Sequence, residues 1–345
     1  MSGTSATHSP YLAVREDWLA RRTEPIIEPA LPIVDPHHHL WDRDGWRYML
    51  PDLLTDLNSG HNIIATVFVQ ARAFHRAGGP EALRPVGETE FVNGVAAMSA
   101  SGQYGPARVC AGIVGHADLR LGAAVEEVLH AHIRAGGDRF RGIRHITTWD
   151  ADASVMNPSY KVPPGLLGDT TFREGFARLA PLDLSFDAWL FHPQIGELAA
   201  LARALPQTRI VLDHVGGPVA IGTYAGKRAD EFERWRPAIR DLAACPNVFV
   251  KLGGMGMRIN GFAFHEGADP PSSEQLEAAW RPYVETCIES FGAARCMFES
   301  NFPVDKGSYS YPVCWNAFKR LASGASAAEK ADLFAGTATR FYRLG

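Results

Sequence analysis

The chain carries thirteen histidines, and several of them stand where short apolar, β-branched runs end. The first such run ends in Asp35-Pro36-His37-His38-His39. There His37 and His39 share one face, because alternate side chains of an extended strand point the same way. Two imidazoles on one face provide half of a metal site or a general acid/base pair. Further histidines follow four later runs, at His116, His145, His192 and His214.

Polar and aromatic side chains near the same run ends are candidates for substrate binding. Arg144 precedes His145, and a guanidinium there suits a carboxylate or a polarised carbonyl, although an ion pair with a neighbouring acid is the alternative. Arg72 follows the second run in the same way. Trp41 and Tyr48 lie on the segment after the first run, where they could form an apolar wall for a ring-shaped substrate or pack on the rim of the fold.

Eight apolar runs alternate with stretches in which apolar residues recur every three or four positions, which predicts parallel strands that are each followed by a covering helix. Eight such units favour a closed (β/α)8 barrel, the TIM barrel of the α/β class. The alternative, an open doubly wound sheet, normally has a Gly-x-Gly-x-x-Gly motif after its first strand, and none occurs here. Glu88 and Glu90 open one predicted helix, where carboxylates favour the helix dipole. The predicted strands are 31–35, 63–70, 107–115, 140–146, 182–190, 208–215, 247–253 and 294–300.

The pattern predicts one large domain. Residues 1–30 are polar and then proline-rich without a sustained period, so we expect an irregular N-terminal extension before a single barrel domain of residues 31–345. Two long insertions, 147–169 and 253–273, follow predicted strands. They are therefore expected over the mouth of the barrel, where enzymes of this architecture keep their sites.

Composition and charge exclude several classes of partner. The 345 residues are 46% hydrophobic with a formal net charge of −4, so there is no basic surplus for nucleic acid or an anionic membrane surface. No apolar run approaches the ~18 residues of a membrane span, and residues 1–18 lack the features of a secretory signal. The five cysteines form no Cys-x-x-Cys motif, which predicts a reducing, cytoplasmic location. We expect a small-molecule substrate, and a homo-oligomer is compatible with the sequence.

Four of the strand-end motifs together resemble a known family. They are His37-x-His39, Phe191–Gln194 (FHPQ), Val211–Gly217 (VLDHVGG) and Asn247–Gly254 (NVFVKLGG). Their order is similar to that of the amidohydrolase superfamily, in particular the amidohydrolase-related branch that includes sugar-acid lactonases and 2-pyrone-4,6-dicarboxylate lactonase. The similarity covers nearly the whole chain, and it implies a TIM barrel with hydrolase activity.

The eighth strand departs from the family pattern. The family usually ends this strand in Gly-Ser-Asp-Trp-Pro, with the aspartate as water-activating base and often as metal ligand, whereas this chain reads Glu299-Ser300-Asn301-Phe302-Pro303. An amide neither takes a proton from water at neutral pH nor gives a metal a negative charge. Glu299 shares the face of Asn301 one layer deeper, so we expect it to supply the missing carboxylate. The alternatives are a site without an active carboxylate, or a structural Glu299 paired with Arg144 or Lys251.

The resemblance also implies a metal site, in which His192 and His214 occupy the fifth- and sixth-strand positions of the family. His37, His39 and His192 are the predicted ligands of one divalent metal, with Zn²⁺ as the first choice and water in the open position. The fourth strand offers Arg144 rather than a bridging ligand, which disfavours a two-metal site. The pyrone lactonase branch also includes metal-independent catalysis, in which these histidines act as hydrogen-bond donors.

The leading hypothesis is a lactonase, a hydrolase of a cyclic ester. Water attacks the lactone carbonyl, Glu299 or failing it His214 removes the proton, and Arg144 stabilises the developing oxyanion. The substrate is expected to be a small polar or carboxylated ring. The other predicted substrate-binding residues are Asn301, Trp41, Tyr48, Arg72 and His145.

Two other functions remain open at this level. A metal-dependent decarboxylase on the same fold needs a bound metal and usually the eighth-strand aspartate, which Asn301 replaces. A catalytically silent binding protein would account for the lost aspartate but not for the retained set of histidines.

Overall fold

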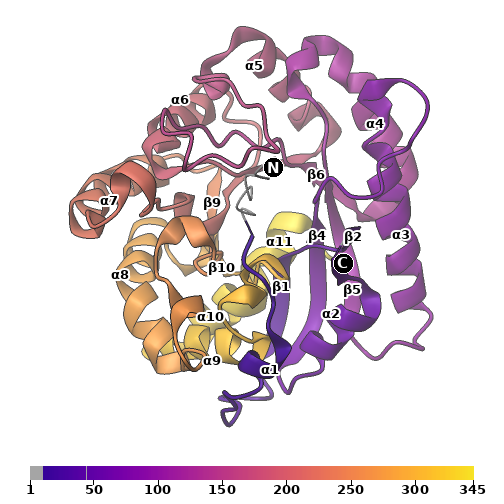
Figure 1. Cartoon of the computed structure of the whole chain (residues 1–345). Helices are drawn as coiled ribbons and strands as arrows, with labels where there is room; N and C mark the ends of the chain where they lie inside the picture. The colour runs from indigo at the N-terminus through magenta and orange to yellow at the C-terminus, as the bar shows by residue number, and fades with distance from the viewer. Residues whose placement is uncertain (1–10, 44) are drawn as a thin grey trace, which may run out of the picture.

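Eight parallel strands follow one another around a barrel in chain order in the computed structural model, which describes residues 11–43 and 45–345 (Figure 1). Neighbouring strands pair in parallel, and between the last strand and the first, His38 pairs with Phe302 and the His39 N–H donates to the Phe302 carbonyl at 2.8 Å. Each predicted run overlaps one strand of the barrel, so the predicted (β/α)8 barrel is confirmed. The strands are β1 (Pro32–His38), β4 (Asn62–Val69), β5 (Arg108–Gly115), β6 (Phe140–Ile143), β7 (Ser185–Ala188), β8 (Ile210–Leu212), β9 (Val248–Leu252) and β10 (Cys296–Phe298).

Helices surround the strands (Figure 1). A helix follows each strand from β4 to β10, whereas β1 is followed by a hairpin of β2 (Trp41–Arg43) and β3 (Trp46–Tyr48). Within the described chain, no helix combines the length and apolar character needed to cross a membrane. The helices are α1 (Glu16–Leu19), α2 (Leu50–Leu57), α3 (Val86–Ala100), α4 (Val125–Gly136), α5 (Thr170–Phe176), α6 (Ile195–Ala204), α7 (Arg228–Ala243), α8 (Ser273–Phe291), α9 (Tyr311–Leu321), α10 (Ala327–Ala331) and α11 (Thr337–Tyr342).

The N-terminal half of the barrel interior is filled by apolar side chains. Val211 of β8 and Met297 of β10 pack there with Phe341 of α11, which lies at the centre of the ring in Figure 1. Because strand side chains alternate, Asp213 and Glu299 stand on the same inward faces two positions further along. The interior therefore changes from apolar to charged toward the C-terminal ends of the strands, and the site lies at that end.

Residues 11–30 cross the barrel and pack against distant segments. Trp18 is buried, and its indole N–H contacts the carbonyls of Gly267 and Ala268 at 3.1 Å each. The ammonium of Lys319 on α9 donates to two main-chain carbonyls of the segment at 2.7 and 2.9 Å. These contacts tie the segment to the 253–273 insertion and to the outer helices.

Candidate active site

A cavity of about 570 Å³ opens at the C-terminal ends of the strands. It is lined by residues that follow four different strands, His39 after β1, Arg144 after β6, His214 after β8 and Asn301 after β10. The insertion of residues 147–169 forms part of its wall. Parallel strands thus bring together polar side chains that are far apart in the sequence.

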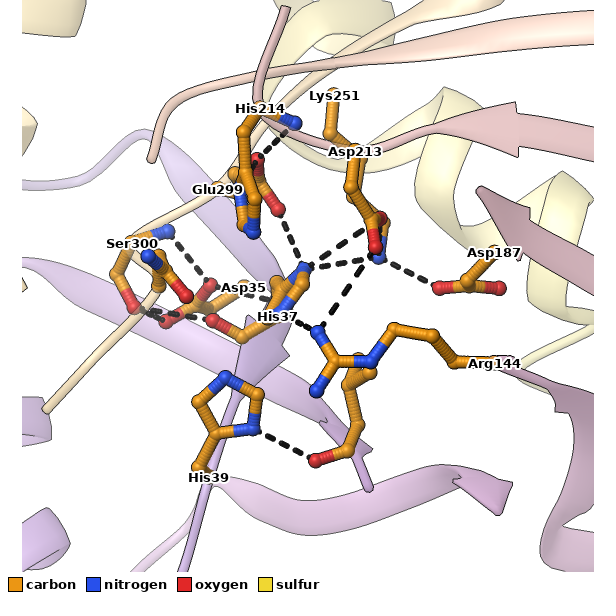
Figure 2. Close-up of polar contacts among 12 residues, drawn as sticks. Asp35, His37, His39, Arg144, Asp187, Asp213, His214, Lys251, Glu299 and Ser300 are labelled. Atoms are coloured by element: carbon orange, nitrogen blue, oxygen red, sulfur yellow. Dashed lines mark hydrogen bonds and ion pairs between the residues drawn. The ribbon is translucent and has the colours of Figure 1, made fainter. Parts of the chain in front are cut away.

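Glu299 lies beneath this cavity and contacts two imidazoles (Figure 2). Its Oε1 is 2.6 Å from His214 Nδ1, and its Oε2 is 2.7 Å from His37 Nδ1. The main-chain N–H of His214 also donates to Oε1, at 3.0 Å. An ionised carboxylate only accepts hydrogen bonds, so both imidazoles are assigned a proton on Nδ1. The carboxylate therefore sets the orientation and the tautomer of both rings.

The protonation states of this group follow from its surroundings. Burial opposes ionisation of Glu299, but its interactions with His214 and His37 outweigh burial and lower the pKa of the carboxyl. Burial, followed by the charge of Lys251, lowers the pKa of His37 well below its usual value. At neutral pH Glu299 is therefore an ionised carboxylate and His37 a neutral imidazole.

His37 has partners on both ring nitrogens, and its Nδ1 lies 3.1 Å from the Lys251 ammonium as well as 2.7 Å from Glu299. With its Nδ1–H donated to Glu299, its Nε2 lone pair accepts from Arg144 Nη1 at 3.2 Å. Arg144 Nη2 donates in turn to the carbonyl of Gln70 at the end of β4. The imidazole and this carbonyl together fix the guanidinium at the edge of the cavity.

A buried ion-pair group lies beside the imidazoles inside the barrel (Figure 2). Lys251 Nζ is 2.7 Å from Asp187 Oδ2 and 3.0 Å from Asp213 Oδ1, and the Tyr342 hydroxyl donates to Asp187 at 2.6 Å. Burial lowers the pKa of Lys251, but the two aspartates and Glu299 outweigh it and raise it, so the ammonium persists. The sequence interpretation did not find the two aspartates. Their signal was a charged residue within the otherwise apolar strand β7, at Asp187, and another directly after β8, at Asp213.

The side chain of Asn301 is hydrogen-bonded to Asp305, four residues later in the chain. Its Nδ2 donates to Asp305 Oδ1 at 2.8 Å, and Asp305 also accepts from the Gly256 N–H and the Tyr309 hydroxyl. Burial raises the pKa of Asp305 to about 6. An aspartate at position 301 would place a second carboxylate against this one, and the two charges would repel each other. The amide at 301 removes that repulsion.

The backbone is strained where it presents His214. This residue and Val215 adopt positive φ angles of 56° and 48°, a conformation that costs of order 1–3 kcal/mol for residues other than glycine. Gly254 approaches the imidazole so closely that a Cβ there would lie 2.1 Å from His214 Nδ1. The second glycine after β9 is therefore needed for the imidazole to reach Glu299.

His192 lies outside the group. Its Nδ1 accepts from the Val219 N–H at 3.2 Å, and its Nε2 lies 3.1 Å from the carboxylate of Glu231 on α7. The structure gives this predicted metal ligand hydrogen-bond partners on α7 and in the loop before it, away from His37.

The predicted substrate-binding residues separate into two sets. Trp41 lines the cavity with Arg144 and Asn301, and its ring stacks on His39 at a centroid distance of 5.7 Å. The others do not line it. Tyr48 donates to a carboxylate of α2 at 2.7 Å, Arg72 lies over the ring of a wall tyrosine, and His145 Nδ1 accepts from a main-chain N–H at 3.2 Å.

His37, His214 and Glu299 form a buried group whose ligand atoms lie within 4.8 Å of one another. Three protein ligands with a fourth position open are typical of a catalytic zinc site, and this donor set fits a divalent metal such as Zn²⁺. The group differs from the predicted ligand set, because His39 and His192 lie outside it. His39 instead places its Nδ1 2.7 Å from the Val69 carbonyl.

The family model described as amidohydrolase matches residues 34–344. The chain belongs to the amidohydrolase family. This confirms the family inferred from the strand-end motifs. Among known relatives of this amidohydrolase, an uncharacterized protein of Sinorhizobium fredii is 34% identical over 336 residues, which cover 91% of this chain and 99% of that protein. The L-fucono-1,5-lactonase of Burkholderia multivorans is 29% identical, with 90% of this chain and 96% of the lactonase covered.

A solved structure of similar fold carries a metal. The crystal structure of an amidohydrolase from Burkholderia multivorans with bound zinc superposes on this amidohydrolase with a TM-score of 0.70 at 28% identity, and the match covers 91% of this chain and 99% of that one. The buried His-His-Glu group of the present chain is a donor set of the kind that zinc accepts.

Proposed function

We propose that this amidohydrolase hydrolyses the ester bond of a small lactone. The observation that carries the proposal is the His214–Glu299 pair at the base of the cavity, with Nδ1 and Oε1 2.6 Å apart. A carboxylate that fixes one tautomer of an imidazole is the arrangement of a general base. Two relatives named L-fucono-1,5-lactonase, at 29% and 27% identity, support a lactone as the ester.

His214 is the group that moves the proton. Its Nδ1–H is bound to Glu299, and no residue in the described part of the chain takes its Nε2, which is available to the cavity. Nε2 accepts a proton from water as the water oxygen attacks the carbonyl carbon. When the ring C–O bond breaks, the proton passes to the departing alkoxide and a hydroxy acid forms. Glu299 acts as the positioning residue, and its charge stabilises the transient imidazolium.

Arg144 is placed to stabilise the oxyanion. Its guanidinium is buried, lines the cavity next to His37 and carries a permanent positive charge. His39 lines the same cavity. Burial, followed by the charge of Arg144, lowers the pKa of His39 well below the usual value. Its Nδ1 proton is donated to the Val69 carbonyl, so its Nε2 is an acceptor for water or a substrate hydroxyl.

A divalent metal would be held by His37, His214 and Glu299, where it would polarise the carbonyl as a Lewis acid and make a bound water more acidic. Arg144 and His39 are each tied to a main-chain carbonyl of residues 69–70, and neither belongs to this group of three.

A screen of lactones against a pH indicator tests the proposal, because hydrolysis of a lactone releases an acid. We expect acid release from at least one five- or six-membered lactone, and loss of that signal in His214→Asn. Release of CO₂ from aromatic acids with no turnover of any lactone would contradict the proposal and favour a decarboxylase. Metal analysis of the purified protein, with the screen repeated after chelation, reports whether the activity depends on a metal.

A further inference from the structure

One wall of the cavity is apolar. It continues outward from His214, whose imidazole meets the Trp189 ring edge-on at a centroid distance of 4.8 Å. This apolar surface therefore begins directly beside the proposed base. It includes Val155, Met156, Trp189, Phe191, Ile221 and Ile259.

Few polar groups of this wall are free to bind substrate hydroxyls. Ser154 donates its hydroxyl to Asp152 at 2.7 Å, and the side-chain oxygen of Asn157 accepts from the Ser159 N–H at 2.9 Å. A sugar hydroxyl buried against such a surface would lose its hydrogen bonds to water without replacement. Each unpaired hydroxyl would weaken binding roughly tenfold.

The charges of the lining are all of one sign. Among the described residues that line the cavity, none is aspartate or glutamate, whereas Arg43, Arg144 and Arg258 are arginines. A cationic substrate would be repelled, and a neutral or anionic one is accepted.

We propose that the substrate of this site is a lactone whose ring carries an apolar alkyl or aryl substituent and no positive charge, rather than a polyhydroxylated sugar lactone. The proposal rests on the proposed lactonase function. It separates this chain from the relatives that are named for a sugar lactone, because the surface beside His214 offers packing instead of hydroxyl partners.

The test compares three six-membered lactones with alkoxide leaving groups: δ-nonalactone with a butyl substituent, unsubstituted δ-valerolactone, and L-fucono-1,5-lactone. We expect kcat/KM for δ-nonalactone to exceed kcat/KM for δ-valerolactone by at least tenfold. We expect it to exceed kcat/KM for the sugar lactone by a larger factor. Ile221→Asn should remove most of the advantage of the butyl group by lowering kcat/KM for δ-nonalactone at least tenfold more than kcat/KM for δ-valerolactone. Ile64→Asn is the control, because Ile64 is 38% exposed and lies outside the cavity.

The outcomes separate this proposal from the function on which it rests. A higher kcat/KM for the sugar lactone would overturn the proposal while the lactonase function stands. If no lactone is hydrolysed, the lactonase function fails, and calorimetric titration with δ-nonalactone and the sugar lactone still decides which ligand the cavity prefers. An equal effect of Ile221→Asn on all three lactones would also contradict the proposal.

A second observation concerns the end of β4. Three consecutive main-chain carbonyls there each accept a hydrogen bond from one polar side chain that lines the cavity. They are Val69 with His39 Nδ1, Gln70 with Arg144 Nη2, and Ala71 with Arg43 Nη2.

Glu88 of α3 binds the main-chain N–H groups of the same segment after β4. Its Oε1 accepts from the Ala71 N–H at 2.8 Å and from the Ala73 N–H at 2.9 Å, and the residue is 1% exposed. Gly87 makes the approach feasible, since a Cβ there would lie 2.6 Å from the Phe74 carbonyl oxygen. Glu88 thus faces the loop after β4 rather than solvent at the helix end.

We infer that Glu88 is a positioning residue for the cavity. Its carboxylate fixes the 71–73 backbone, this backbone fixes the carbonyls of residues 69–71, and the carbonyls orient His39, Arg144 and Arg43. None of these contacts involves the substrate directly. Loss of the carboxylate should therefore disturb three groups of the site at once.

Glu88→Ala tests this inference, and Glu90→Ala is its control. Glu90 lies two positions after Glu88, and its carboxylate is 49% exposed and paired with Arg76. We expect Glu88→Ala to lower kcat at least tenfold on the best lactone and to shift the ¹⁵N signals that report the tautomer of His39. Glu88→Gln should restore most of both, because an amide oxygen accepts the same two N–H groups. Glu90→Ala should change neither.

A lower melting temperature of Glu88→Ala with unchanged kcat and unchanged His39 signals would overturn the inference, because it would assign Glu88 a structural role only. If Glu88→Ala does not fold, Glu88→Asp decides, since its shorter side chain withdraws the carboxylate from the two N–H groups. Wild-type kcat and His39 signals in Glu88→Asp would count against the inference in the same way.

Discussion

At the scale of single residues, the proton chemistry depends on a carboxylate between two imidazole N–H groups. Glu299 accepts from His37 on one oxygen and from His214 on the other. A glutamine offers one acceptor and one donor, so its NH₂ would face an imidazole N–H and force that ring into the other tautomer. Asn301 instead donates its Nδ2 to Asp305.

We therefore expect Glu299→Gln to lower kcat by roughly 10³-fold or more, as a wrong histidine tautomer does in other acid–base groups. Asn301→Ala should leave measurable turnover, because the imidazole tautomers are unchanged. Steady-state kinetics on the lactone that the screen selects measures both variants, with circular dichroism to verify that they fold. A similar loss in the two variants, or a loss in neither, would contradict the assignment of Glu299.

At the scale of elements, the alternation of side chains along strands and the eight-strand pattern predicted which residues form the core of the site. Alternation along β1 predicted His37 and His39 on one face and His38 on the other, and His38 does point between strands, where its Nε2 lies 2.8 Å from the Thr66 hydroxyl. The eight-strand pattern predicted that His39, Arg144 and His214 would converge. It succeeded because inward direction and strand ends depend only on local periodicity.

The same reasoning failed to place side chains that come after the strand has ended. His192 stands four positions beyond β7 in a short 3₁₀ turn, so strand alternation no longer sets its direction. Its partners, Val219 and Glu231, are brought to it by a loop and a helix that lie later in the chain. Tyr48, on the β2–β3 hairpin, likewise finds its carboxylate on α2. Tertiary contacts of this kind leave no periodic signal in the sequence.

At the scale of the whole molecule, stability couples to pH through buried imidazoles. Burial, the first cause in each case, lowers the pKa of ten histidines among the described residues, to about 4 for His116 and His132 and to about 3 for His145. Burial also raises the pKa of six carboxyls, to about 7 for Glu88 and about 6 for Asp35. The two sets act in opposite directions.

Between pH 6.5 and 4 the unfolded chain protonates histidines that the folded chain keeps neutral, so the free energy of unfolding falls as the pH falls. The carboxyls with raised pKa oppose this, because the folded state holds their protons in that range, but they are fewer.

We therefore expect a net loss of stability below about pH 6, measurable as a falling melting temperature. His132→Gln should flatten this dependence, since one such histidine contributes up to about 3 kcal/mol. His130→Gln on the same helix is the matched control, because His130 is 47% exposed. A steeper or unchanged dependence in His132→Gln would show that the buried imidazoles do not govern the acid limit of the fold.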